Sequence, residues 1–128
     1  MTKLHRKKAT AMRYQLWPEF SKRIRVRDKR CLVDGHGFGV CGGVLHASHF
    51  YPKGSHPLLM LFPLNCCAMC ARHHLFWWHR NPVEAWQWYV HVIPHTWRDQ
   101  LECMRMNALG RKGMTEAELR AEWEAWGI

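Results

Sequence analysis

Basic side chains are interspersed with apolar ones over the first thirty residues, and no wide apolar stripe emerges. Residues 1–16 show no strong helical period, so we expect them to be irregular or weakly helical and mobile. Trp17-Pro18 is typical of a helix start, because proline is tolerated in the first turn. Phe20 and Ile24 then fall on one helical face, which predicts a short helix over residues 18–29.

The middle of the chain changes to loop and strand patterns. Residues 31–44 are rich in glycine and have no period, which indicates a loop. Residues 44–50 predict a short strand, and glycine and proline then punctuate residues 51–63, where we expect a loop with room for a second short strand. The pattern of residues 65–79 is compatible with a helix.

Two helix starts near the C-terminus have clear capping residues. The sequence Asn-Pro-Val-Glu at 81–84 supplies an N-cap, a proline at the first helical position and a glutamate in the first turn, so we expect a helix to about Val92. The sequence Thr-Glu-Ala-Glu at 115–118 is a capping box that opens a final helix to about Trp126. Another short helix is expected over 96–108.

Length and composition bound the size of the fold. A chain of 128 residues forms one domain with a modest core, which its eight Trp and seven Met can fill and a structural metal would reinforce. No apolar run reaches the roughly 20 residues needed to span a bilayer, and no secretory signal is visible, so we expect a cytoplasmic protein.

The positive charge is concentrated at one end of the chain. The net charge is +9, and residues 1–30 hold eleven Lys and Arg against only Glu19 and Asp28, which accounts for the whole excess. Such a basic arm is typical of proteins that bind nucleic acid, and a solvated tail is the simpler alternative. An amphipathic membrane helix is disfavoured because no useful apolar stripe exists.

The cysteines indicate a zinc site. In a reducing compartment clustered cysteines are metal ligands more often than disulfides, although buried cysteines without a metal are also common. Structural zinc takes four N or S ligands, usually as two pairs. Cys67 with Cys70 and Cys70 with His73 have the favourable spacing of two intervening residues, and Cys31 with Cys41 spans the glycine-rich loop.

The order of these motifs resembles a known family. Phe20-Ser-Lys-Arg-Ile-Arg-Val-Arg-Asp28, followed by Cys31, resembles the first helix and zinc knuckle of the NinG-type phage recombination proteins, which belong to the HNH, or ββα-metal, endonucleases. Ala47-Ser48-His49-Phe50 resembles their first-histidine strand. Asn65, followed by Cys70-Ala-Arg-His73-His74, resembles the end of the HNH motif.

Further along, Asn81-Pro-Val-Glu-Ala-Trp86 is similar to the helix that follows in related phage proteins, and the resemblance covers about residues 17–93. It implies a small α+β fold, in which a zinc-stapled ββα-metal nuclease domain with flanking helices covers residues 17–93. A flexible basic arm (1–16) precedes this domain and a helical extension (94–128) follows it.

The resemblance also implies a role for each site residue. His49 becomes the general base that takes a proton from water, Asn65 braces the loop that holds His49, and His74 binds a catalytic Mg²⁺ or Mn²⁺. Ser48 stands where a metal ligand is usual, which leaves His79 as the spare ligand. The implied structural zinc ligands are Cys31, Cys41, Cys70 and His73, with Cys67 as the alternative to His73.

The implied partner is DNA, with no membrane partner. The residues expected to contact phosphates are Arg23, Arg25, Arg27, Lys29, Arg30 and Lys53. The tryptophans could stack on unpaired bases, but core packing is the stronger expectation in so small a domain. The acidic final helix could form a homodimer or fold back on the basic arm.

The sequence thus predicts a metal-dependent DNA endonuclease, with branched or recombination intermediates as the substrates that the resemblance favours and the cytoplasm of a bacterial host as its location if a phage encodes it. A non-catalytic zinc-finger module that binds nucleic acid or a host protein is the alternative. A third possibility is an interaction protein that uses its aromatic surface.

Overall fold

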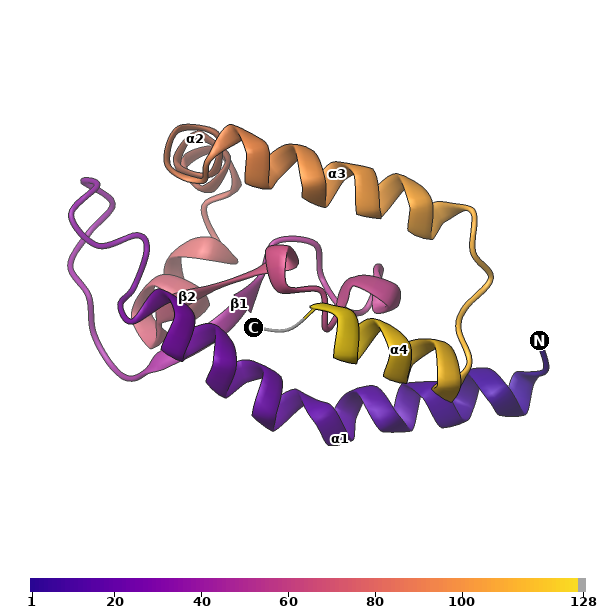
Figure 1. The fold of residues 1–128 in the computed structure, drawn as a ribbon. Coiled ribbons are helices and arrows are strands. Elements are labelled where there is room, and N and C mark those ends of the chain that lie inside the picture. The colour runs from indigo at the N-terminus through magenta and orange to yellow at the C-terminus, as the bar shows by residue number, and fades with distance from the viewer. Residues whose placement is uncertain (127–128) are drawn as a thin grey trace.

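The computed structural model describes residues 1–126 of the chain, in which four α-helices surround a small β-hairpin (Figure 1). α1 runs along one side of the hairpin and α3 along the other, while α4 lies beside the N-terminal half of α1. The elements are α1 (Lys3–Asp28), β1 (Leu45–His49), β2 (Cys66–Cys70), α2 (Pro82–Val92), α3 (His95–Leu109) and α4 (Glu116–Trp126). The architecture is therefore α+β, as predicted.

Helix α1 begins far earlier than the sequence pattern predicts. Thr2 caps it, with its side-chain oxygen accepting a hydrogen bond from the His5 backbone N–H at 3.1 Å. Pro18 lies inside the helix, where it removes one backbone hydrogen bond. The expectation of an irregular segment over residues 1–16 is wrong because Ala9 and Met12 are buried against α4, a partner at the far end of the sequence.

β2 replaces the first part of the helix expected over residues 65–79, whereas the later part is helical and includes the π-helical segment His73–Trp78. β1 and β2 pair antiparallel, so that His49 lies opposite Cys66 and Leu45 opposite Cys70. Every residue of β2 is buried, and a fully buried strand shows no alternation that would distinguish it from a buried helix. The loop over 51–63 forms short 3₁₀ turns at Pro57–Leu59 and Pro63–Asn65 and contains no second strand.

The predicted helix starts near the C-terminus are confirmed. α2 begins at Pro82, although the Asn81 amide donates to the Trp77 carbonyl at 3.2 Å and does not cap the helix. At α4 the backbone N–H of Glu118 donates to Thr115 Oγ1 at 3.2 Å, and Glu118 accepts from the Thr115 N–H at 3.0 Å. This is the reciprocal pair of a capping box.

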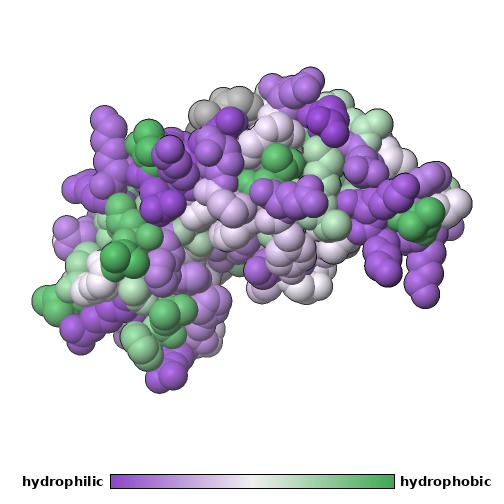
Figure 2. All heavy atoms as spheres, turned by 90° about the horizontal axis from the view of Figure 1, so that it is seen from below, coloured by the Kyte–Doolittle hydropathy of each residue, from purple (hydrophilic) through white to green (hydrophobic). Residues whose placement is uncertain are grey.

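Three apolar clusters hold these elements together. One joins α1, β1 and α4, a second joins β2 to α2 and the residues after α1, and a third lies between the 3₁₀ turns and α3. Trp88 is fully buried and Trp77 nearly so, which matches the expectation of core packing, whereas Trp86 is exposed. The face on which α1 lies is largely hydrophilic (Figure 2). Among the described residues, no helix has the length and apolar character that crossing a bilayer requires.

Candidate metal centre and histidine cluster

Three cysteines and one histidine converge from four parts of the fold. Cys31 follows the end of α1, Cys41 lies in the glycine-rich loop, Cys70 ends β2 and His73 begins the next helical segment. Their Sγ and ring nitrogen atoms all lie within 4.8 Å of one another. Cys31, Cys70 and His73 are buried and Cys41 is exposed, so the cluster lies just beneath the surface.

The distances in this cluster fit a tetrahedral zinc ion. Nδ1 of His73 lies 3.2 Å from Cys70 Sγ, 3.5 Å from Cys31 Sγ and 3.6 Å from Cys41 Sγ. Zinc bonds of about 2.3 Å to sulfur and 2.0–2.1 Å to nitrogen place tetrahedral S and N ligands about 3.6 Å apart. Three thiols and one imidazole are also a donor set that structural zinc commonly uses.

Neighbouring groups prepare two of these ligands for a metal. Nε2 of His73 lies 3.1 Å from the Phe38 carbonyl, and a proton on Nε2 leaves the Nδ1 lone pair facing the three sulfurs. Burial opposes ionisation of Cys70, but hydrogen bonds from the His73 and Gly42 backbone lower its pKa to about 7. Cys67, the alternative to His73, is outside this cluster; burial, with Asp28 nearby, raises its thiol pKa well above the usual range.

A second group, of histidines, lies beside the metal cluster. Nδ1 of His46 on β1 is 3.0 Å from Nδ1 of His74, and the ring of His79 has its centroid 4.9 Å from that of His74. Burial, together with His79, His46 and His49, lowers the pKa of His74 to about 4. His74 is therefore neutral at pH 7, which is the state that binds a metal ion. The structure thus brings together His46, His74 and His79.

The spacing of His74 and His79 has a backbone cause. Residues 73–78 form a π-helical segment, in which hydrogen bonds join residues five apart. An α-helix has 3.6 residues per turn, so a step of five residues goes well past one turn. The wider π-helix has more residues per turn, so the same step comes closer to one full turn. The two histidines consequently lie on the same side of the segment, although the sequence spacing alone places them only roughly together.

His46 was not among the predicted site residues. Alternate residues of a strand share a face, so His46 lies on the same face of β1 as Ser48. Ser48 is fully buried, and its hydroxyl has no hydrogen-bond partner among residues 1–126. The period of two along 45–49 is the sequence feature that could have identified His46.

His49 ends β1 and faces α1. Its ring stacks on Trp17 with centroids 4.9 Å apart, and its Nε2 lies 2.8 Å from the Met60 carbonyl. Burial lowers the pKa of His49. The hydrogen bond with the Met60 carbonyl partly offsets this effect, and the nearby charge of Lys53 adds to it. A neutral ring that donates from Nε2 to Met60 presents an unprotonated Nδ1.

Asn65 holds the loop that follows His49. Its amide accepts from the Tyr51 N–H at 2.8 Å and donates to the carbonyls of Tyr51 at 3.0 Å and Leu59 at 3.1 Å. Asn65 is fully buried, so these bonds replace all contact with water. They fix the Met60 segment against which His49 rests.

The predicted phosphate-binding residues have different surroundings. Arg27 donates to the carbonyls of Pro63 and Cys66 and to the Asp28 carboxylate, so its guanidinium is engaged within the fold. Arg23 pairs with Glu19 and lies over the Trp123 ring. Arg25 lines a cavity of about 260 Å³ together with His46 and His74.

Outside that cavity, Lys53 lies over the rings of Tyr14 and Trp17. Lys29 caps α1 in the left-handed conformation, and its side chain and that of Arg30 are exposed.

Comparison of the chain with family models, curated proteins and solved structures finds no match. The class of this protein is therefore described from its fold and its candidate site alone. It is a small α+β protein with a two-stranded antiparallel sheet and a Cys₃His group that could hold a metal ion such as zinc.

Proposed function

We propose that the protein is a zinc-containing, metal-dependent endonuclease of the HNH type that hydrolyses phosphodiester bonds in DNA. The observation that carries this proposal is the grouping of the imidazoles of His46, His74 and His79, with a half-buried His49 at the end of β1 close enough to act on the charge of His74. The chain order of strand, asparagine-containing loop, strand and helical segment is also that of the ββα-metal motif.

Each residue has a role in this proposal. Nδ1 of His49 accepts a proton from the attacking water, because Nε2 is occupied by the Met60 carbonyl. Asn65 is a positioning residue that keeps this carbonyl in place through the loop. His74 and His79 would hold the catalytic divalent ion, with His46 in place of Ser48, and such an ion would polarise the phosphate and stabilise the leaving oxygen.

The position of α1 supports a polyanionic substrate. Arg25 lines the same cavity as His46 and His74, so a phosphate bound there would meet a guanidinium next to the imidazoles. The exposed Lys29, Arg30 and Lys53 would contribute non-specific attraction, which makes binding fall steeply with salt. Branched DNA is the substrate class that the likeness to the NinG group favours.

Nuclease assays test the proposal directly. Zinc-loaded protein is incubated with supercoiled plasmid and with a four-way junction, with and without Mg²⁺, Mn²⁺ or Ni²⁺. Cleavage should need an added divalent ion and should fall by about 100-fold or more in His49→Ala, because a positioned general base contributes at least that much. His91→Ala removes an exposed histidine of α2 and should cleave like the wild type.

Cleavage that survives His49→Ala would overturn the assignment of the base. Binding to DNA without cleavage under any metal would instead support the zinc-finger alternative.

A further inference from the structure

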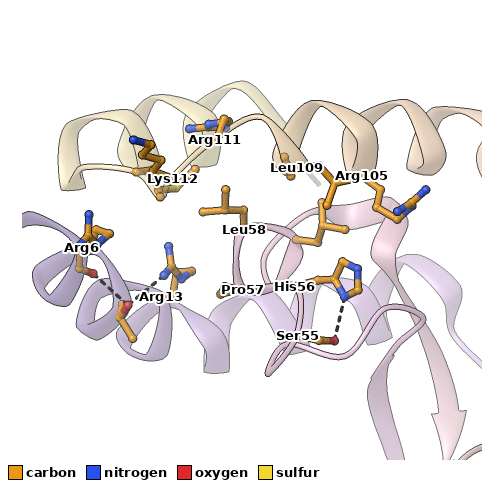
Figure 3. A pocket seen from close by; sticks show the side chains of 15 residues that line it. Arg6, Arg13, Ser55, His56, Pro57, Leu58, Arg105, Leu109, Arg111 and Lys112 are labelled. Atoms are coloured by element: carbon orange, nitrogen blue, oxygen red, sulfur yellow. Dashed lines mark hydrogen bonds between the residues drawn. The ribbon is translucent and has the colours of Figure 1, made fainter. Parts of the chain in front are cut away.

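A second cationic site lies at the opposite end of α1 from the histidine cluster. It is a cavity of about 360 Å³ between the N-terminal half of α1, the loop around residues 55–59 and the chain that joins α3 to α4. Figure 3 shows Arg6 and Arg13 on α1 facing Lys112 and Arg111 across this space, with Leu58 between them. The volume is in the range of small-molecule sites, about 300–1,000 Å³.

The positive charge of this cavity is not neutralised within the described residues. Arg111 pairs with Glu118 and Glu122, but Arg6, Arg13 and Lys112 have no carboxylate at ion-pair distance among residues 1–126. Three cations thus share one concave surface without a counter-charge. Such a surface attracts an anion.

Arg13 is the most unusual of these cations because it is buried. Only 6% of its surface is exposed. Its Nη2 donates to Thr10 Oγ1 at 3.0 Å, whereas its Nη1 has no hydrogen-bond partner among residues 1–126. Glu122, the acidic group that acts on Arg13 at longer range, is bound by Arg111 at 2.7 Å. A buried guanidinium with an unused donor is costly unless a ligand supplies the acceptor.

Backbone packing gives the cavity a fixed wall. Gly113 has φ +139°, and a Cβ there would lie 2.9 Å from the Arg6 side chain, so the α3–α4 connection lies directly against α1. The adjacent Met114 is buried with Ala9 and Met12 of α1. The cations therefore lie on elements that the core holds in place, which reduces the entropic cost of binding.

We infer that this cavity, lined by Arg6, Arg13 and Lys112, binds a phosphate group. Phosphate suits the site because guanidinium groups bind its oxygens through charge-assisted hydrogen bonds and it carries several acceptors. The apolar side chains of Leu58 and Leu109 beside the cations would accept the body of a nucleotide. The phosphate could belong to nucleic acid or to a free nucleotide, and the experiments below separate the two sources.

If the phosphate belongs to nucleic acid, the inference rests on the proposed function. It then gives the distance between the scissile phosphate at the histidine cluster and the phosphate bound by Arg13. Ser21 of α1 lines the cavity that contains His46 and His74, and Arg13 lies eight residues before it. Eight residues of α-helix span about 12 Å. A duplex advances 3.4 Å per nucleotide along its axis, so a duplex lying parallel to α1 would bring Arg13 to a phosphate about three or four nucleotides from the scissile bond.

Calorimetric titration of the zinc-loaded protein with inorganic phosphate and with a nucleoside 5′-monophosphate tests the cavity without reference to cleavage. Loss of a charge-assisted hydrogen bond should weaken binding about 10-fold or more in Arg13→Met and about 3-fold in Lys112→Gln. Lys8→Gln removes a charge from the same helix outside the cavity and should bind like the wild type. Wild-type protein that binds neither compound, or equal affinities in all four proteins, would overturn the inference.

The source of the phosphate is tested with a short duplex in which single phosphates are replaced by neutral methylphosphonates. If nucleic acid is the ligand, one replacement about three or four nucleotides from the cut weakens binding by the wild type but not by Arg13→Met. Duplex binding that Arg13→Met leaves unchanged, with monophosphate binding lost, identifies a free nucleotide and overturns the nucleic-acid part. Absence of cleavage would sink the proposed function alone, since the titrations do not depend on it.

Discussion

The two ends of the molecule are held together by different forces. At one end, Cys31, Cys41, Cys70 and His73 converge from a loop, a strand end and a helix start, and polar ligand atoms occupy the centre. At the other end, α1 and α4 bury apolar side chains such as Met12 and Leu119 against each other. A metal ion held at the first end would join four separate parts of the chain through one set of bonds, whereas the second end is held mainly by apolar burial. The difference predicts that the two ends respond to different perturbations.

Removal of the metal should have the largest effect and should be confined to one end. Cys70→Ser, or chelation of zinc, should lower the free energy of unfolding by about 5 kcal/mol or more, because structural zinc contributes folding energy directly. Hydrogen exchange should show lost protection over residues 31–78 and retained protection where α1 meets α4. Cys103→Ser, at an exposed cysteine outside the cluster, serves as the control. Uniform loss of protection along the chain would show that the two ends unfold as one unit.

A cavity in the helical end is the complementary perturbation. Leu119 is 1% exposed, and Leu119→Ala should cost about 2–4 kcal/mol through lost burial and the cavity that remains. Zinc affinity, measured by competition with a chromophoric chelator, should not change. Leu109→Ala, at an exposed leucine, should leave the free energy of unfolding within about 0.5 kcal/mol of the wild type. A large drop in zinc affinity in Leu119→Ala would contradict the separation of the two ends.

The loop between the two ends offers a third test. Asn65→Ala removes three hydrogen bonds from a fully buried amide and should cost about 2–3 kcal/mol in urea unfolding. Zinc should still bind one ion per chain, because Asn65 is not a ligand. Asn65→Asp keeps the size but sets a buried carboxylate oxygen against the carbonyls of Tyr51 and Leu59, so at neutral pH it should be at least as destabilising as Asn65→Ala. An Asn65→Ala protein as stable as the wild type would show that the loop is held by apolar contacts instead.

The smallest expected effect concerns the start of α4. Thr115→Ala removes the hydroxyl that accepts the Glu118 N–H and should cost about 1 kcal/mol. Thermal unfolding of the zinc-loaded protein and of the chelated protein should show the same decrement, since the cap belongs to the end that does not depend on zinc. Thr115→Ser keeps the hydroxyl and should recover most of the stability.

The features that the sequence predicted best are those set by a few neighbouring residues, such as helix starts and ligand spacing. The proline at 82 and the capping box at 115–118 gave the starts of α2 and α4, and the spacing of Cys70 and His73 indicated their pairing. The N-terminal half of α1 could not be predicted, because its buried face depends on α4 and Pro18 suggested a later start. β2 was missed because all five of its residues are buried and alternation is absent.

The candidate site was predicted in part for a related reason. His49, Asn65 and His74 were selected by their order along the chain, and the pairing of β1 with β2 sets their positions. The contact of His46 with His74 depends on the face of a strand, and that of His79 with His74 on a change of helical type, neither of which follows from motif spacing. The cationic cavity was missed altogether, since Arg6, Arg13 and Lys112 meet only because α4 folds back.

The π-helical segment at His73–Trp78 bears on how such a site could arise and diverge. When one residue is inserted into an α-helix and the flanking turns are kept, the extra residue can be accommodated as a π-helical turn. Deletion of Leu75 or Phe76, both exposed, would restore an ordinary turn and set the two histidines four residues apart, the spacing usual for paired helical ligands.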